Sequence, residues 1–516
     1  MTPSAPGSTS ANGSTLPPGQ RAVVAGILMV MFLAALDGTI IGTLMPTVIS
    51  SIGGLSLYPW APTAFNLAST VATPLYGKLS DLYGHKRFIL LAIAIFVIGS
   101  MLCGMAQTML QLILFRAIQG IGAGGLLTMS FIMFGVLFPP ETRGKMQGLL
   151  SSVWGVASVV GPVAGAFFVE TLSWRWAFYI NVPVGILAAW LIWAYLKVPD
   201  QQSAPPKVDW VGAALFSSAI LFLLYGFLEV GQGPVTPYEI AAIVLGLILT
   251  TALILYERKV EDPILPVALF KNPIFTASVS LGFIAGAAVF STSSFVPLWV
   301  QGVLGESAGT AGRVLTSMSI GWVTGATICG RMLNRFGFRT LTVTGACFMA
   351  TGFALFSTAT PETSTWLLTG YNVLLGLGMG FVATTTVLAV QSTAPQRMIG
   401  AATSGNQLFR GIGGTLGLAV LGGIQLGIFA IQLRLVQGQN PAPELQQLAA
   451  EPHRILDPAV HAALPPNVAG VLSQSLADSI HMVFVLSLAL MLLGVFLAWR
   501  MPKGGPVEVA AARSAE

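Results

Sequence analysis

Residues Leu33–Pro46 read LAALDGTIIGTLMP and place a single acid, Asp37, inside a strongly apolar run. The run extends over residues 22–48 without another charge, and a helix needs about 20 apolar residues to cross a bilayer. An ionisable side chain in such a helix costs roughly 2.5–3.5 kcal/mol on insertion scales, so it usually faces a bundle interior or a wet cavity. We therefore expect a membrane-spanning helix in which Asp37 handles protons. An acid that only pairs with a neighbouring helix is the simpler alternative.

The composition extends this expectation to the whole chain. Of the 516 residues, 54% are hydrophobic and only 8% are charged, whereas a soluble domain carries about 25% charged residues. The 58 glycines and 31 prolines suit membrane helices, in which small residues allow close packing. The sequence therefore predicts an all-α polytopic membrane protein.

Cofactor chemistry finds no support in the sequence. Cys103, Cys329 and Cys347 lie in or beside apolar runs, without the spacing of a disulfide framework or a metal site. The four histidines form no metal-binding motif, and no GxxxxGKS or GxxxxGKT phosphate-binding loop occurs. We expect neither an enzyme nor an ATP-driven pump, and no metal, cofactor or nucleic-acid partner.

Apolar runs that are long enough to span a bilayer recur about fourteen times. Basic residues collect in alternate loops between them. Eighteen of the 24 Lys and Arg residues fall on the side of the N-terminus, three fall on the opposite side, and Arg116, Arg313 and Arg410 lie within or near spans. Because Lys and Arg favour the cytoplasmic side, both termini are predicted to be cytoplasmic.

A repeated motif divides the chain into two halves. Residues 77–87 read GKLSDLYGHKR, and residues 330–339 read GRMLNRFGFR with the same spacing of glycines and basic residues. Internal repeats are typical of transporters, whose substrate site lies between the repeats. The predicted organisation is a tail at 1–20, a six-helix bundle at 21–200, a linker with two extra spans at 201–270, a second six-helix bundle at 271–500 with an outer loop at 431–478, and a tail at 501–516.

The first copy of the repeat resembles the loop signature of the major facilitator superfamily. The glycines permit tight turns and close helix approach, and Asp81 with the basic cluster can form a charge-paired latch. A merely solvated loop is the alternative. The predicted latch residues in the two copies are Gly77, Asp81, Gly84, Lys86, Arg87, Gly330, Arg335, Gly337 and Arg339.

A second motif, from Arg116 to Gly120, reads RAIQG and resembles the fourth-helix motif of the same superfamily. The resemblance implies that Arg116 lies near Asp37, takes part in proton transfer, and favours the ionised carboxylate when the two are close. A structural hydrogen bond from Arg116 to a helix backbone is the alternative.

A third motif resembles the antiporter motif of the fifth helix, which implies export. Glycines on one face allow close packing, and a proline bends the helix. A general packing face of small residues is the alternative. The motif residues are Gly155, Gly161, Pro162 and Gly165.

Short motifs over nearly the whole chain make the resemblance specific to one subfamily. ALDGT at residues 35–39, WRWAFYINVPVG at 174–185, DWVG at 209–212 and GAATS at 400–404 together resemble the EmrB/QacA-type drug:proton antiporters with fourteen helices. The resemblance implies two six-helix bundles plus two linker helices. It also implies a monomer in a bacterial cytoplasmic membrane that exchanges protons for amphipathic small molecules. Export of a lipid or an envelope precursor on the same fold is the alternative.

The substrate cavity is expected to be adaptable and weakly charged. One central acid suits neutral or monovalent lipophilic substrates better than dications, because the spans after residue 270 contain no further acid. The candidate cavity residues are Trp60, Gln119, Met129, Phe295, Trp299, Tyr371 and Arg410.

Overall fold

The computed structural model describes residues 17–54, 57, 60–197, 209–230, 236–260, 263, 267–439, 466–506 and 508–509. Regular structure in these residues is entirely helical, which confirms the all-α prediction. Residues 1–16, the linker segment 198–208 and the outer segment 440–465 lie outside the described residues, together with the expectations made for them.

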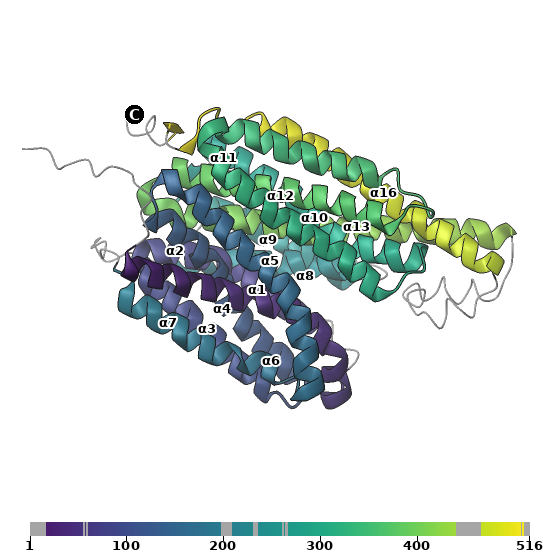
Figure 1. Cartoon of the computed structure of the whole chain (residues 1–516), viewed down its shortest axis with the longest axis horizontal. Coiled ribbons are helices and arrows are strands. Elements are labelled where there is room, and N and C mark those ends of the chain that lie inside the picture. Colours follow the sequence, from purple (N-terminus) through teal and green to yellow (C-terminus); the bar gives the residue numbers. More distant parts are fainter. Residues whose placement is uncertain are drawn as a thin grey trace, which may run out of the picture.

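The first half of the chain forms one bundle, which occupies the lower part of Figure 1. In it α2 and α3 pack on α4, while α1 packs on α5 and α7. Its apolar core joins residues of α1, α3, α4 and α7. The helices are α1 (Pro18–Ile52), α2 (Trp60–Tyr83), α3 (His85–Met105), α4 (Met109–Leu137), α5 (Pro140–Thr171), the short α6 (Trp176–Tyr179) and α7 (Asn181–Tyr195).

The second half forms another bundle with its own core, above the first in Figure 1. Between the halves in sequence come α8 (Trp210–Val230) and α9 (Pro237–Glu257), which pack on each other. The second half contains η2 (Val267–Lys271), α10 (Pro273–Leu298) with the π-helical turn η3 (Trp299–Val303), α11 (Ala308–Phe356), α12 (Thr365–Thr393), η4 (Gln396–Met398), α13 (Ile399–Gln439) and α16 (Pro466–Ala498).

The repeat is visible in the backbone. α11 is interrupted at Gly337, which has a φ of 75°, so that its two parts, 308–336 and 338–356, are each about as long as one membrane span. Gly84 occupies the same place between α2 and α3 and has a φ of 98°. Side chains rarely adopt this left-handed region, so both copies use glycine where one helix turns into the next.

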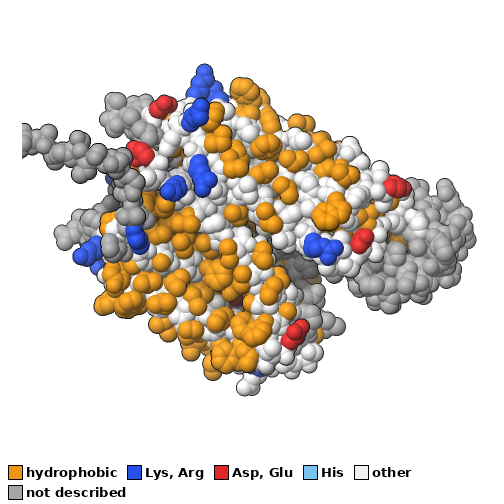
Figure 2. All heavy atoms as spheres, in the orientation of Figure 1, with side chains coloured by type: hydrophobic (Ala, Val, Ile, Leu, Met, Phe, Trp, Pro, Cys, Tyr) orange, Lys and Arg blue, Asp and Glu red, His pale blue; other side chains and the backbone are white. Residues whose placement is uncertain are grey.

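Among the described residues, twelve helices are long and apolar enough to cross a membrane. This number counts α11 once and leaves out α2, which carries Lys78 and Asp81. Figure 2 shows apolar side chains over much of the visible face, and most of the visible Lys and Arg side chains toward its left end. The helices support a multi-pass membrane protein, while the fourteen crossings and the cytoplasmic termini stay predictions.

Candidate functional site

Asp37 lies in the first bundle with hydrogen bonds to both oxygens of its carboxylate. Its side chain is 1% exposed. Oδ2 accepts a hydrogen bond from Nη1 of Arg116 at 2.5 Å, and Oδ1 accepts one from Nε2 of Gln119 at 2.8 Å. A buried carboxylate is stable when it is paired with a cation and hydrogen-bonded. The geometry therefore suits the ionised form of Asp37.

The partners of Asp37 come from one face of α4, because residues three apart on a helix are neighbours. Arg116 also donates from Nη1 to Oε1 of Gln119 at 2.7 Å. Gln119 donates from Nε2 to Oγ of Ser100 on α3 at 2.6 Å, and Asn181 of α7 donates to the same oxygen at 2.8 Å. The buried network thus joins α1, α3, α4 and α7.

Aromatic rings hold the guanidinium of Arg116 in place. Its central carbon lies 4.0 Å from the ring centre of Phe65 and 6.0 Å from that of Phe178, within the range of cation–π attraction. Among the described residues, Asp37 is the acid that pairs with Arg116. Removal of this acid would therefore leave a buried cation without its counter-charge.

The antiporter-like motif lies against α1 at positions two and six residues after Asp37. A Cβ atom on Gly161 would lie 2.1 Å from Oγ1 of Thr39, and one on Gly165 would lie 2.1 Å from Oγ1 of Thr43. Thr39 also donates a hydrogen bond to the backbone oxygen of Ala157 at 3.0 Å. These glycines therefore let α5 contact α1 beside the buried acid. The other members of the motif face the second half, because Gly155 lies against Val323 and Pro162 lines a cavity described below.

The first copy of the repeat joins α2 to α13 in the other half. A Cβ atom on Gly77 would lie 2.7 Å from the backbone oxygen of Gly400. The two oxygens of Asp81 accept hydrogen bonds from the backbone nitrogens of Gly400 at 2.9 Å and Ala401 at 2.8 Å. These donors belong to the first turn of α13, whose backbone N–H groups have no partner within the helix.

The second copy makes the equivalent contact between α11 and α5. A Cβ atom on Gly330 would lie 2.0 Å from the backbone oxygen of Gly144, and one on Gly144 would lie 2.4 Å from that of Gly330. Asn334 stands where the first copy has Asp81, and its Nδ2 donates to the backbone oxygen of Glu141 at 3.0 Å. The two repeats thus join the halves at two interfaces, α2 with α13 and α5 with α11, which we call the two seams. One interface uses a carboxylate and the other an amide.

The basic residues of the repeats bind mainly within their own halves. Lys86 donates from Nζ to the backbone oxygens of Trp193 and Leu196 at 2.7 and 2.9 Å, which satisfies carbonyls at the end of α7. Arg339 donates from Nε to the backbone oxygen of Met501 at 2.8 Å. Arg335 lies 5.4 Å from the ring centre of Phe336, and Arg87 is exposed on α3.

Acidification is expected to favour the arrangement in which Asp81 is bonded to α13. Burial raises the pKa of this carboxyl to about 7, although hydrogen bonds from Ala401 and Gly400 act in the opposite direction. An exposed aspartate titrates near ~3.9, so the bonded arrangement binds the proton more tightly. The bonded arrangement is therefore increasingly favoured as pH falls from about 7 toward about 4. This stabilisation by the proton is lost as pH rises through the pKa of Asp81 in the bonded arrangement, about 7.

Spin labels at Lys145 on α5 and Arg397 on η4, which are exposed on opposite halves, would measure this effect. The short-distance population should be larger at pH 6 than at pH 8, and Asp81→Asn should remove the difference. A short-distance population that grows as pH rises would contradict the prediction.

The predicted cavity residues do not meet in one place. Gln119 belongs to the Asp37 network, Met129 lies in the first core, and Arg410 donates to Gln407 on its own helix. The aromatic members lie apart: Phe295 and Trp299 are buried in the second core, Tyr371 packs on its edge, and Trp60 stacks on Tyr225 of α8. A role for any of the seven in substrate binding stays a prediction.

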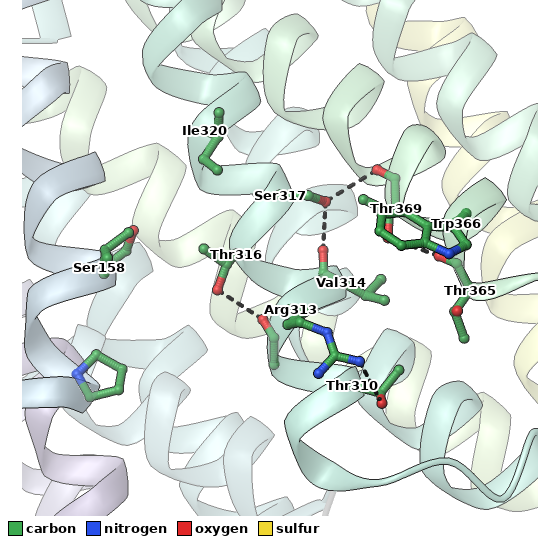
Figure 3. Close-up of a pocket in the computed structure, with 13 residues that line it drawn as sticks. Ser158, Thr310, Arg313, Val314, Thr316, Ser317, Ile320, Thr365, Trp366 and Thr369 are labelled. Carbon is green, nitrogen blue, oxygen red and sulfur yellow. Dashed lines mark hydrogen bonds between the residues drawn. The ribbon is translucent and has the colours of Figure 1, made fainter. Parts of the chain in front are cut away.

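A cavity of about 590 Å³ lies between α5 of the first half and α11 and α12 of the second. Figure 3 shows Ser158 on one side and Thr316, Ser317 and Arg313 on the other. This volume is in the range of small-molecule sites. Sequence reasoning missed the cavity, because its hydroxyl-bearing residues are common in membrane helices and do not form a motif.

Comparison with known proteins agrees with this architecture. The family model described as Major Facilitator Superfamily matches residues 27–418. Multidrug transporter protein MdtP of Bacillus subtilis (strain 168) is 36% identical over 505 residues, which cover 93% of this chain and 93% of that protein. Multidrug resistance protein 3 of the same organism is 36% identical over 473 residues, with coverage of 90% and 92%.

The fold also matches solved structures. The structure of the proton:xylose symporter XylE bound to 6-bromo-6-deoxy-D-glucose has a TM-score of 0.61 at 14% identity, and covers 95% of this chain and 98% of that one. At this identity the match concerns the fold alone. Membership of a family rests on the family model and on the two Bacillus relatives. The chain belongs to the Major Facilitator Superfamily, a family of membrane transporters and not of enzymes.

Proposed function

We propose that this chain exports lipophilic or amphipathic small molecules across a bacterial cytoplasmic membrane in exchange for protons. The names of its relatives, a multidrug transporter and a multidrug resistance protein, support export of such molecules. The observation that carries the proton coupling is the buried pair of Asp37 and Arg116 on α1 and α4. A charge inside a membrane helix costs free energy, and such residues usually mark proton or substrate pathways.

The hydrogen bonds of Asp37 provide a mechanism that couples proton uptake to movement of the halves. Protonation from the outer side would remove the negative charge that balances Arg116 and would weaken the contact between α1 and α4. Thr39 lies two residues after Asp37 on α1 and donates a hydrogen bond to Ala157 of α5. A shift of α1 would therefore move α5, which contacts α11 of the other half. Substrate release and rocking of the halves would follow, and Asp37 would lose its proton inward when the next substrate binds.

The arrangement of the halves corresponds to one stage of this cycle. The repeats join the halves at the end that carries most of the basic residues, through the contacts of Gly77 and Gly330. By the positive-inside rule this end is cytoplasmic. The cavity begins at Ser158, farther along α5 than the contacts of Gly144 and Gly155. We assign the structure to a state that is closed toward the cytoplasm.

Proton movement in proteoliposomes tests the proposed function. Protein is reconstituted with a pH-sensitive dye in the lumen, a pH gradient is imposed, and three probes are added separately: neutral chloramphenicol, cationic ethidium and anionic 8-anilinonaphthalene-1-sulfonate. Proton flux that depends on at least one probe and is absent from protein-free liposomes supports the proposal. Correctly inserted protein that moves no protons with any probe would overturn it.

A further inference from the structure

The two seams between the halves differ in how they are covered. On the seam of α2 and α13, the ring of Trp60 stacks on that of Tyr225 in α8, with centres 5.8 Å apart. Phe216 of α8 shares an apolar cluster with Leu67 of α2 and Leu408 of α13. The helices α8 and α9 lie at the back of Figure 1, between the bundles. The extra pair therefore covers this seam.

The opposite seam contains the cavity between α5, α11 and α12. One part of its wall is apolar and includes Val159, Pro162, Ile320 and Trp366, and Trp366 is 82% exposed. Another part carries hydroxyl groups, such as those of Ser158 and Thr316 (Figure 3). A wall of this kind suits an amphipathic molecule better than a fully polar one.

Arg313 gives the cavity its charge. It is the charged member among the residues that line the cavity, and its side chain is exposed. Nη2 donates to Oγ1 of Thr310 at 3.0 Å, and Thr310 in turn donates to Oε2 of Glu306 at 3.3 Å. Among the described residues no acid forms an ion pair with Arg313. Most of its five N–H donors are therefore available to a ligand.

The positions along α11 match the length of such a ligand. Arg313 lies five residues after the start of α11 at Ala308, which is about 7.5 Å along the helix axis. Ile320 lies seven residues further, about 10 Å deeper by the same rise. A head group at Arg313 would thus lie near the membrane surface, and an apolar tail would extend toward Ile320.

We propose that this cavity binds an amphiphile with an anionic head group, which is held by Arg313 while its tail lies against Val159, Pro162, Ile320 and Trp366. The inference rests on the proposed export function and narrows its substrate class. The same chemistry would suit an acidic drug or an anionic lipid, and the experiment below separates these two sources.

The cavity is also placed to affect the proton site. Ser158 lines the cavity, and its neighbour Ala157 accepts the hydrogen bond from Thr39 of α1. A ligand between α5 and α11 therefore contacts the helix that lies against α1, two residues after Asp37. This contact gives one physical route by which an occupied cavity changes the surroundings of the acid.

Equilibrium binding without a pH gradient tests the inference. Protein in phosphatidylcholine nanodiscs is titrated with radiolabelled decanesulfonate and decyltrimethylammonium, which share a tail and carry opposite fixed charges, and empty nanodiscs give the background. We expect the wild type to bind decanesulfonate more tightly. Arg313→Gln should weaken decanesulfonate binding at least tenfold and should not weaken decyltrimethylammonium binding, because it removes a positive charge from the cavity. Arg313→Lys keeps the charge and should bind decanesulfonate nearly as tightly as the wild type.

Two controls complete the design. Arg175→Gln changes an arginine that donates to Ala106 outside the cavity, and should leave binding unchanged. Ile320→Trp should weaken decanesulfonate binding by filling the site of the tail. Tighter binding of decyltrimethylammonium by the wild type, or decanesulfonate binding that Arg313→Gln does not change, would overturn the inference.

Two comparisons identify the source of the ligand and separate this inference from the proposed function. Phosphatidylglycerol in the nanodisc that competes with decanesulfonate would indicate an anionic lipid, whereas unchanged affinity would favour a soluble acidic substrate. Asp37→Asn should bind decanesulfonate through Arg313 even when proton flux is lost. Flux without Arg313-dependent binding would overturn only the inference, and binding without flux would overturn only the proposed function.

Discussion

Asp37→Asn is expected to abolish substrate-dependent proton flux in proteoliposomes. Asparagine can accept a hydrogen bond but cannot take up and release a proton, so the step that would couple the gradient to export is lost. The variant also leaves Arg116 buried without its counter-charge, which costs about 3–5 kcal/mol when one member of a buried ion pair is removed. Flux is measured with the luminal dye, and unfolding of the purified protein is measured in parallel.

The double variant Asp37→Asn with Arg116→Gln separates coupling from folding. It removes both charges, so stability should recover toward the wild type while proton flux remains absent. Glu170→Gln, which changes an exposed acid at the end of α5, is the matched control and should keep flux. Wild-type proton flux in folded Asp37→Asn protein would show that another group couples transport.

Gly330→Ala is expected to separate the halves at the end where the repeats join them, and to slow the proposed export strongly. The added methyl group would lie 2.0 Å from the backbone oxygen of Gly144, and neither backbone can move without separating α11 from α5. Overpacking typically costs about 1–3 kcal/mol, which corresponds to roughly 5- to 150-fold in a two-state equilibrium. The population with short distances between labels at Lys145 and Arg397 should fall accordingly.

Gly411→Ala on α13 is the matched control. A Cβ atom at Gly411 has no neighbour within 4 Å, and alanine favours a helix over glycine by about 1 kcal/mol. This variant should keep the wild-type distances and proton flux. A Gly330→Ala protein with unchanged distances would show that the closed end does not depend on this glycine contact.

The helical membrane fold and the two central charged residues could both be predicted from the sequence, because long apolar runs indicate membrane helices and a charge within such a run is conspicuous. A charge inside an apolar run is visible without a structure, and so Asp37 and Arg116 stood out, with a resemblance that suggested their proximity. The glycine spacing of the repeat likewise indicated equivalent turns, and Gly84 and Gly337 adopt equivalent left-handed conformations.

Other parts of the site depend on tertiary packing. Ser100 and Asn181 are uncharged, and only the crossing of α3 and α7 brings them to Gln119 and the acid. Phe295 lies on α10, whose apolar residues are spread around the helix and do not gather on one face, so periodicity could not show that this ring faces the core. The cavity around Arg313 forms only where α5 of one half meets α11 and α12 of the other. The order of the spans in the sequence does not show which helices of the two halves are neighbours.

The packing of α8 has a consequence for the direction of movement. Through Phe216 and Tyr225 it contacts α2 of one half, and through the same apolar cluster it contacts α13 of the other. If the halves move as rigid bodies and the contacts of α8 persist, we expect the axis of rotation to lie near α8. The displacement of one half against the other would then be larger at the interface of α5 and α11 than beside α8. The helix pair outside the repeats would thus make the movement of an internally duplicated molecule asymmetric.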